Sequence, residues 1–300
     1  MKAFSWPNEV TNEAATDITT AVTSSESNDT DFIEVNALQL ECLAIGPPPS
    51  EQLTLVLLHE GLGSVELWRD FPQQLQAATG CGVFLFSRAG YGNSDPCALP
   101  RPLDYMTREA TEVLPQVLDA AGIGKCVLIG HSDGASIAAI NAGFVEDHRV
   151  RGLVLIAPHF FTESFALDAI ADAKVAYDTG DLKNRLAKYH QHVDVAFRGW
   201  NDAWLAPEFK DWNVADAIDH IRVPVLAIQG EQDQYGSIAQ INEIEERIYA
   251  PVERCLIDNC KHSPHLEQSV QCLASMKKFI ARLIHIENQP SGLHSGSVGT

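Results

Sequence analysis

The 300-residue chain carries 40 Asp and Glu against 21 Lys and Arg, which gives a formal net charge of −19 at pH 7. This acidic excess opposes nucleic-acid phosphates and anionic membrane surfaces, so we expect neither as a partner. No apolar stretch approaches the roughly 20 residues of a membrane span, and residues 1–10 lack the basic start and apolar core of a signal peptide. We expect a cytoplasmic protein with one core domain and no stable membrane insertion; the oligomeric state stays open.

The cysteines and histidines do not form a recognisable metal or disulfide pattern. The seven cysteines are odd in number and contain no Cys-x-x-Cys pair, which argues against a disulfide framework and a zinc site. Two close histidine pairs, His190 with His192 and His262 with His265, lack a carboxylate or thiolate partner at zinc-protease spacing. The sequence therefore predicts no metal site.

The chain begins with a polar stretch, residues 1–30, that has no apolar periodicity and is expected to be a loose arm. Alternating apolar residues over 32–45 predict a two-stranded hairpin that turns near Asn36. Continuous apolar runs then recur, which fits strands covered on both faces of a parallel sheet. These runs are residues 53–58, 83–86, 126–129, 153–156 and 223–228.

Helical segments accompany these runs. The alternation of strand and helix predicts a doubly wound, mostly parallel α/β sheet with functional loops at the carboxyl ends of the strands. We assign residues 31–159 and 217–287 to this core and residues 288–300 to a flexible C-terminal tail. The predicted helices are residues 65–78, 105–121, 135–144 and 237–248.

Residues 160–216 break this rhythm, because helical periodicity and many aromatic side chains fill a gap that one helix would normally span. We expect an inserted helical cap over the strand-end cleft, where it would shape a pocket and exclude water. Trp200 and Trp204 are candidate substrate-binding residues of this cap, although such aromatics also pack a cap onto its core.

The stretch Gly130-His131-Ser132-Asp133-Gly134 follows the third apolar run and precedes a row of small residues. A Gly-x-Ser-x-Gly pattern between a strand and a helix is typical of a sharp turn that presents its serine, because glycine has no Cβ to clash where the chain doubles back. Ser132 is therefore the candidate nucleophile. His131 either packs under this serine or binds substrate.

A serine nucleophile needs a base and an orienting acid, which follow such a turn in the order Ser, Asp or Glu, His. Asp233 comes shortly after the fifth apolar run, and His262 follows the predicted last strand. A neutral imidazole there can take the Ser132 proton while Asp233 fixes its tautomer. His265 is the alternative base, or else has a structural role.

An oxyanion hole is expected from two backbone N–H groups. One belongs to Asp133, which follows the nucleophile. The other comes from the loop after the first apolar run, where Gly61 and Leu62 are both candidates. Glu60 precedes them, and a charged carboxylate aimed at an oxyanion would oppose the reaction. We expect that Glu60 either turns away or binds a polar group of the substrate.

The serine turn, the acid and base that follow it, the early glycine loop and the helical insertion together resemble the α/β-hydrolase superfamily over about residues 31–285. The segment Ser87–Ser94 is similar to a loop of that family with a mainly structural role. The resemblance implies hydrolysis of an ester, thioester, amide or activated carbon bond through an acyl-enzyme, without a cofactor. Family members that open epoxides or remove halides carry Asp where this chain has Ser132. The family commonly has Gly where this chain has Glu60 and Lys261.

We therefore predict a serine hydrolase with a capped pocket that acts on a small carboxylic ester. The main alternative is a carbon–carbon bond hydrolase for a β-diketone-like substrate, followed by a peptidase and a cofactor-free haloperoxidase. A small-ligand receptor that keeps a slow hydrolase site is the alternative from another class. In each case the partner is a small molecule, whose identity depends on side-chain orientations that the sequence does not fix.

Overall fold

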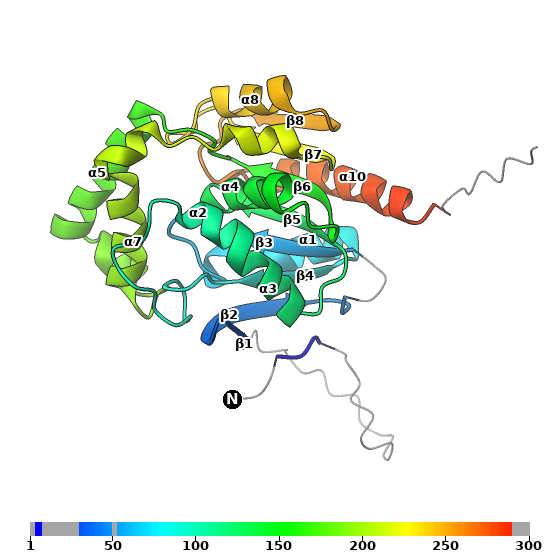
Figure 1. Ribbon diagram of the computed structural model, residues 1–300, viewed down its shortest axis with the longest axis horizontal. Coiled ribbons are helices and arrows are strands. Elements are labelled where there is room, and N and C mark those ends of the chain that lie inside the picture. Colours follow the sequence, from blue (N-terminus) through cyan, green and yellow to red (C-terminus); the bar gives the residue numbers. More distant parts are fainter. Residues whose placement is uncertain (1–3, 8–29, 50–52, 290–300) are drawn as a thin grey trace, which may run out of the picture.

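The computed structural model describes residues 4–7, 30–49 and 53–289. An eight-stranded sheet runs through its centre in the order β1-β2-β4-β3-β5-β6-β7-β8 (Figure 1). The pairings of β1 with β2 and of β2 with β4 are antiparallel, and the others are parallel. The doubly wound, mostly parallel sheet is confirmed. Its strands are β1 (Asp31–Val35), β2 (Leu38–Ile45), β3 (Thr54–Leu58), β4 (Gly82–Phe86), β5 (Cys126–His131), β6 (Val150–Ile156), β7 (Val225–Gly230) and β8 (Val252–Ile257).

The central strands are apolar throughout because helices cover both of their faces. Strands β3, β4, β5 and β7 are buried along their whole length, whereas the edge strands β1 and β8 include exposed residues. The β1–β2 hairpin turns at Asn36 and Ala37, whose φ angles of 53° and 61° match a two-residue hairpin turn with positive φ at both positions. The predicted hairpin is therefore confirmed.

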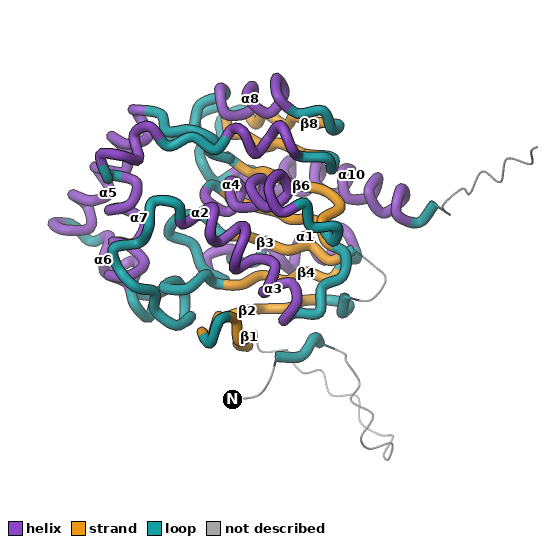
Figure 2. The backbone as a smooth tube through the Cα atoms, in the orientation of Figure 1, coloured by secondary structure: helices purple, strands orange, loops and turns teal. Residues whose placement is uncertain are grey.

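Two apolar cores lie on opposite faces of the sheet. Helices cover both of these faces (Figure 2). Alternate residues of β3 divide between them: Leu55 and Leu57 pack in one core, and Val56 and Leu58 in the other. Helices α1 (Phe71–Thr79) and α10 (Ser269–Glu287) contribute to the first core. Helices α2 (Tyr105–Arg108), α3 (Leu114–Ala120), α4 (Asp133–Ile140) and α8 (Ala239–Arg247) contribute to the second.

Two predicted helices are interrupted. The helix expected at 65–78 consists of a 3₁₀ turn, η1 (Glu66–Trp68), and α1, separated at Arg69, whose φ of 55° is not helical. The helix expected at 105–121 contains a wide π turn, η2 (Glu109–Val113), between α2 and α3. Pro115 lies in the first turn of α3 and has no N–H for a helical hydrogen bond, which accounts for the change in helix type. A second π turn, η3 (Asn141–Val145), follows α4.

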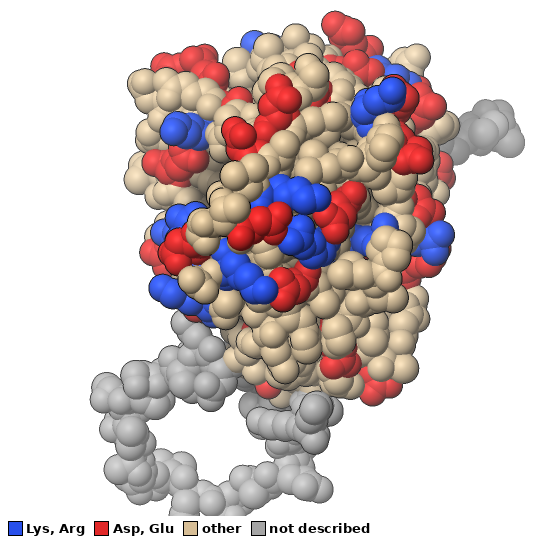
Figure 3. All heavy atoms as spheres, turned by 90° about the vertical axis from the view of Figure 1, so that its left-hand side faces the viewer, with Lys and Arg blue, Asp and Glu red and all other residues tan. Residues whose placement is uncertain are grey.

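The segment between β6 and β7 is mainly helical, and α5 and α7 lie together beyond one end of the sheet (Figure 1). Its two ends pair with each other through an antiparallel bridge between Phe161 and Asn213. On its outer face acidic and basic side chains are interspersed (Figure 3), including the ion pairs Arg198–Asp178 and Lys183–Asp194. Its elements are α5 (Ser164–Thr179), α6 (Leu182–Leu186), α7 (Val193–Trp204), η4 (Pro207–Asp211) and η5 (Ala215–His220).

Residues 4–7 depart from the predicted loose arm. Trp6 is buried, and its Nε1–H donates to the Ala121 carbonyl oxygen at 3.0 Å. One large aromatic side chain is enough to hold this short segment, without the periodicity on which the prediction relied. The remainder of the predicted arm up to residue 29, and the predicted tail from residue 290, lie outside the described residues. None of the helices in the described part of the chain is long and apolar enough to cross a membrane.

Candidate active site

Ser132 lies in a strained turn between β5 and α4. Its backbone angles are φ 54° and ψ −119°, which residues with a side chain rarely adopt. A Cβ on Gly130 would lie 2.2 Å from the Gly134 carbonyl oxygen, and a Cβ on Gly134 would lie 2.0 Å from the Leu58 carbonyl oxygen. The structure therefore has the predicted strand, turn and helix, and the close backbone approach requires both glycines.

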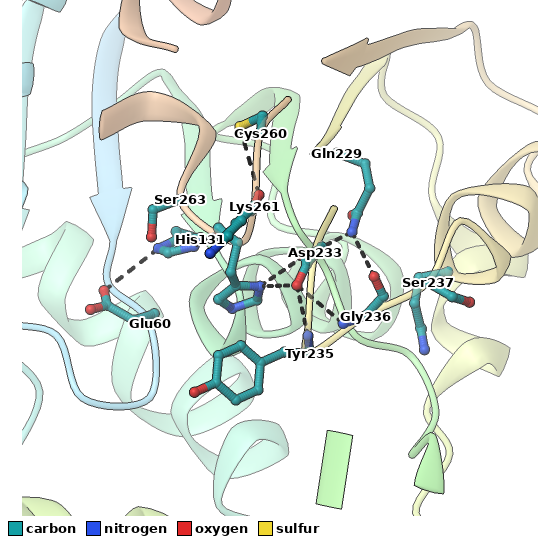
Figure 4. Close-up of polar contacts among 12 residues, drawn as sticks. Glu60, His131, Gln229, Asp233, Tyr235, Gly236, Ser237, Cys260, Lys261 and Ser263 are labelled. Atoms are coloured by element: carbon teal, nitrogen blue, oxygen red, sulfur yellow. Dashed lines mark hydrogen bonds and ion pairs between the residues drawn. The ribbon is translucent and has the colours of Figure 1, made fainter. Parts of the chain in front are cut away.

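Asp233 and His262 follow β7 and β8 and contact each other. The Nδ1 atom of His262 lies 2.9 and 2.8 Å from the two carboxylate oxygens of Asp233 (Figure 4). The same carboxylate accepts the Tyr235 backbone N–H and a Gln229 Nε2 hydrogen, both at 2.8 Å. Burial acts to raise the pKa of Asp233, but the hydrogen bond and charge of His262 outweigh it and lower the pKa. Asp233 is thus an anion that holds a hydrogen on Nδ1 of His262.

Ser132 and His262 line the same cavity, which has a volume of about 110 Å³. Its walls come from loops that follow five parallel strands and from α5 and α7. Glu60, Trp200 and Trp204, three of the candidate substrate-binding residues, also line this cavity. The fourth candidate, His131, is not among the described residues that line it, which agrees with the alternative that His131 packs under the serine turn. His131 is buried beneath the cavity because β5 has both faces covered.

The loop after β3 is fixed by two side chains that the sequence analysis did not choose, Arg88 and His190. Arg88 Nη1 donates to the His59 carbonyl oxygen at 2.6 Å, and its Nη2 donates to the Glu60 carbonyl oxygen at 3.0 Å. His190 Nε2 lies 3.0 Å from the Leu62 carbonyl oxygen, to which it donates. The motif around Arg88 was interpreted as structural, but no sequence signal connects His190 with this loop.

The orientation of the peptide between Glu60 and Gly61 follows from these contacts. The Glu60 carbonyl oxygen accepts several hydrogen bonds, the shortest from His59 Nδ1 at 2.7 Å. In a trans peptide the N–H points opposite to the C=O, so the Gly61 N–H points away from these donors. Within the described residues, the N–H groups of Gly61, Leu62 and Asp133 have no protein acceptor. All three are therefore free to bind a ligand oxygen.

The Asp133 side chain connects the serine turn to α7. The Tyr105 hydroxyl donates to Asp133 Oδ2 and accepts the Trp204 Nε1–H at 3.0 Å. Burial raises the pKa of Asp133, more than nearby Arg88 lowers it. Trp204 also lines the cavity, so one hydrogen-bonded chain joins a cavity wall to the residue after Ser132.

Glu60 does not turn away from the cavity. Its Oε2 lies 3.6 Å from Nδ1 of His131, and its side chain is 31% exposed. Burial alone would raise the pKa of Glu60, but His131 outweighs it and lowers the pKa. Glu60 lines the cavity, so the expectation that it turns away is not met, and its binding to a polar group of the substrate stays a prediction.

Two further side chains, His159 and Tyr235, pack against the His262 ring. His159 and Tyr235 line the cavity, and burial lowers the pKa of His159 to about 3, so its imidazole is neutral. No sequence pattern singled out His159, although it follows β6 at the carboxyl edge of the sheet, where functional loops gather. His265, the alternative base, does not contact Asp233; it packs 4.8 Å from the Trp68 ring. Burial lowers the pKa of His265 well below its ordinary range.

Across the described residues, no group of three His, Cys, Asp or Glu side chains could hold a metal ion.

The chain matches the model of the alpha/beta hydrolase family over residues 55–274. Epoxide hydrolase 2 of Siraitia grosvenorii is 30% identical over 128 residues, which cover 43% of this chain and 38% of that protein. The chain thus matches only about two fifths of the length of such curated relatives.

Two solved structures show the same fold. The proline iminopeptidase of Mycobacterium smegmatis has a TM-score of 0.69 at 18% identity, over 86% of this chain and 99% of that one. A bacterial membrane phospholipase A has a TM-score of 0.70 at 17% identity, over 85% and 86% of the two chains. At these identities the likeness concerns the fold alone.

Proposed function

Because the chain belongs to the alpha/beta hydrolase family, we propose that it is a serine hydrolase that cleaves a small carboxylic ester. Ser132 is the nucleophile, His262 the base and Asp233 the acid that orients the base. The observation that carries this proposal is the 2.8 Å contact between His262 and Asp233 beside a cavity that the strained Ser132 also lines.

The reaction proceeds through an acyl-enzyme. Ser132 Oγ attacks the ester carbonyl carbon while His262 Nε2 takes its proton, and Asp233 stabilises the resulting imidazolium. The carbon–oxygen bond to the alcohol then breaks, and the alcohol leaves with the proton from His262. Water attacks the acyl group, His262 again takes and returns a proton, and the carboxylic acid is released with Ser132 restored.

Two backbone N–H groups stabilise the oxyanion that forms in both steps. We assign one to Asp133 and the second to the loop after β3. Gly61 is favoured over Leu62 for the second donor, because the carbonyl of its own peptide is held on the opposite side. Each such donor is worth roughly 3 kcal/mol of transition-state stabilisation in well-studied cases. The segment with α5 and α7 acts as a cap that keeps water from the acyl-enzyme.

The curated relatives named epoxide hydrolases point to a neighbouring chemistry. Epoxide opening in this family uses an aspartate at the nucleophile position, where this chain has Ser132. A serine leads instead to an acyl-enzyme, so the proposal remains ester hydrolysis.

The test is turnover of short p-nitrophenyl esters, together with labelling by a fluorophosphonate. We expect Ser132→Ala to lose both, and Ser164→Ala, which changes an exposed serine at the start of α5, to keep both. A wild-type protein that turns over no short ester and takes no label would contradict the proposal. Cleavage of a β-diketone in preference to every ester would identify a carbon–carbon bond hydrolase, and ligand binding without product would identify a receptor.

A further inference from the structure

The cavity around Ser132 has an unusual charge distribution. Among the described residues that line it are two carboxylates, Glu60 and Asp133, and no Lys or Arg. The Asp133 carboxyl is buried and bound by Tyr105, whereas the Glu60 side chain keeps 31% of its surface exposed. Glu60 is therefore the charged group that a ligand in this cavity meets first.

The position of Glu60 is set by neighbours that leave its oxygens available. A Cβ on Gly63 would lie 2.3 Å from Glu60 Oε2 and 2.7 Å from His59 Cβ, so any side chain at position 63 would displace the Glu60 carboxylate from where it lies. His131 contacts the same oxygen, with its Nδ1 at 3.6 Å (Figure 4). Within the described chain, no group lies close enough to donate a hydrogen bond to the Glu60 carboxylate.

The protonation of His131 follows from its other ring nitrogen. His131 Nε2 lies 2.7 Å from the His262 carbonyl oxygen, which can only accept, so Nε2 carries a hydrogen. Nδ1 then faces Glu60, is buried, and has no hydrogen-bond partner. His131 thus contacts the Glu60 carboxylate from the buried side, and the carboxylate lone pairs on the cavity side stay free.

The size of the cavity limits what can meet Glu60. Its volume of about 110 Å³ is smaller than the roughly 150 Å³ apolar cavity that accommodates benzene. Leu62, Ile170, Trp200 and Trp204 make the remaining wall largely apolar. The part of a ligand that the cavity encloses is thus small, with apolar carbon on one side and a polar group opposite Glu60.

We propose that Glu60 determines the specificity of this site by accepting a hydrogen bond from an N–H or O–H group on the substrate. Resting on the proposed hydrolase function, this inference identifies the substrate as a small ester that bears a hydroxyl or ammonium group. Esters with a second carboxylate are disfavoured, because Glu60 repels them and no cation lines the described wall.

The test compares kcat/KM for ethyl butyrate, ethyl 3-hydroxybutyrate, ethyl 3-aminobutyrate and monoethyl succinate, measured by acid release. A charged hydrogen bond corresponds to a preference of about 10- to 100-fold for a donor-bearing ester over ethyl butyrate. Comparison of propyl acetate with 2-hydroxyethyl acetate tests whether Glu60 binds a donor on the alcohol side of the ester. Comparison of the hydroxyl esters with the amino ester shows which of the two donor groups is preferred.

Three variants assign the preference to Glu60. Glu60→Leu removes the acceptor and should bring the ratio of kcat/KM for a donor-bearing ester to that for ethyl butyrate to about one. Glu60→Gln keeps a carbonyl acceptor and should lose mainly the preference for the ester with an ammonium group. Glu66→Gln, an exposed acid of the next turn, is the matched control and should keep the wild-type ratio. A wild-type ratio near one for every pair, an unchanged ratio in Glu60→Leu, or a preference for monoethyl succinate would overturn the inference.

A binding measurement separates this inference from the proposed hydrolysis. The affinities of Ser132→Ala for butyramide and 3-hydroxybutyramide, measured by calorimetry, should differ by the same factor, and adding Glu60→Leu should remove the difference. If no ester turns over but this difference is present, the hydrolase proposal fails and the role of Glu60 stands. If esters turn over but neither ratio depends on Glu60, only the role of Glu60 fails.

Discussion

Replacement of Gly134 by alanine should damage both the stability and the turnover of this protein. A Cβ at this position would lie 2.0 Å from the Leu58 carbonyl oxygen, whereas real Cβ atoms essentially never come closer than 3.0 Å. Helix α4 and the end of β3 must therefore separate by about 1 Å. Overpacking of this kind costs roughly 1–3 kcal/mol of unfolding free energy. It also moves Ser132 away from the loop that follows β3, and a misplacement of about 1 Å can cost roughly 100-fold in rate.

The assay pairs thermal unfolding with kcat on a short p-nitrophenyl ester. At roughly 2–4 °C per kcal/mol for chains somewhat smaller than this one, the expected fall in Tm is several degrees. The control is Gly124→Ala, because Gly124 is exposed and its Cβ would meet nothing within 4 Å. That variant should be neutral or gain about 0.4–1 kcal/mol. If Gly134→Ala keeps both the wild-type Tm and the wild-type kcat, the backbone contact at Leu58 does not position Ser132 and the reasoning is refuted.

Three other changes test separate parts of the site. Asp233→Asn should lower kcat on the same ester by roughly 10⁴-fold with the fold intact by circular dichroism, because an amide NH₂ in place of a carboxylate oxygen favours the wrong tautomer of the imidazole. A loss below tenfold would show that Asp233 does not have its assigned role. Tyr105→Phe should lower the free energy of unfolding, measured in urea, by about 1–3 kcal/mol, because it leaves the buried Asp133 carboxyl without its donor. The control is Tyr249→Phe, at an 88% exposed tyrosine, and an equal loss in the two variants would contradict this prediction. Burial lowers the folded-state pKa of His265. Its contribution to stability is therefore present above the unfolded pKa of about 6.5 and is lost as the pH falls from 6.5 toward the lowered pKa. His265→Phe should flatten the fall in Tm over that range, and an unchanged slope would show that His265 is not held neutral.

The sequence was sufficient for the features that depend on local pattern. Continuous apolar runs predicted the central strands because both faces of those strands are buried, and residues 126–129 became part of β5. The glycines around Ser132 predicted the strained turn, since only glycine permits the backbone contacts at Gly130 and Gly134. The sequence was less informative about helix interruptions, such as the break at Arg69, because these depend on how each helix meets the sheet.

The order of Ser132, Asp233 and His262 along the chain indicated which side chains belong together, because parallel strands bring their carboxyl ends to one edge. The sequence favoured His262 over His265 as the base and left His265 as the alternative. The tertiary structure places the first on Asp233 and the second against Trp68. The packing of His265 depends on three-dimensional contacts, which its spacing from His262 does not reveal.

The environment of Glu60 was likewise decided by tertiary contacts alone. The sequence showed an acid in the loop after β3 but left open whether it turned away. The side chains around Glu60 and its loop come from segments distant in the chain. His131 contacts its carboxylate, Arg88 binds its carbonyl oxygen, and His190 binds the next part of the loop. Hydrogen bonds and burial between such distant segments fix where a side chain points. The sequence therefore determined which chemical groups are present, and the fold determined which neighbours each group faces.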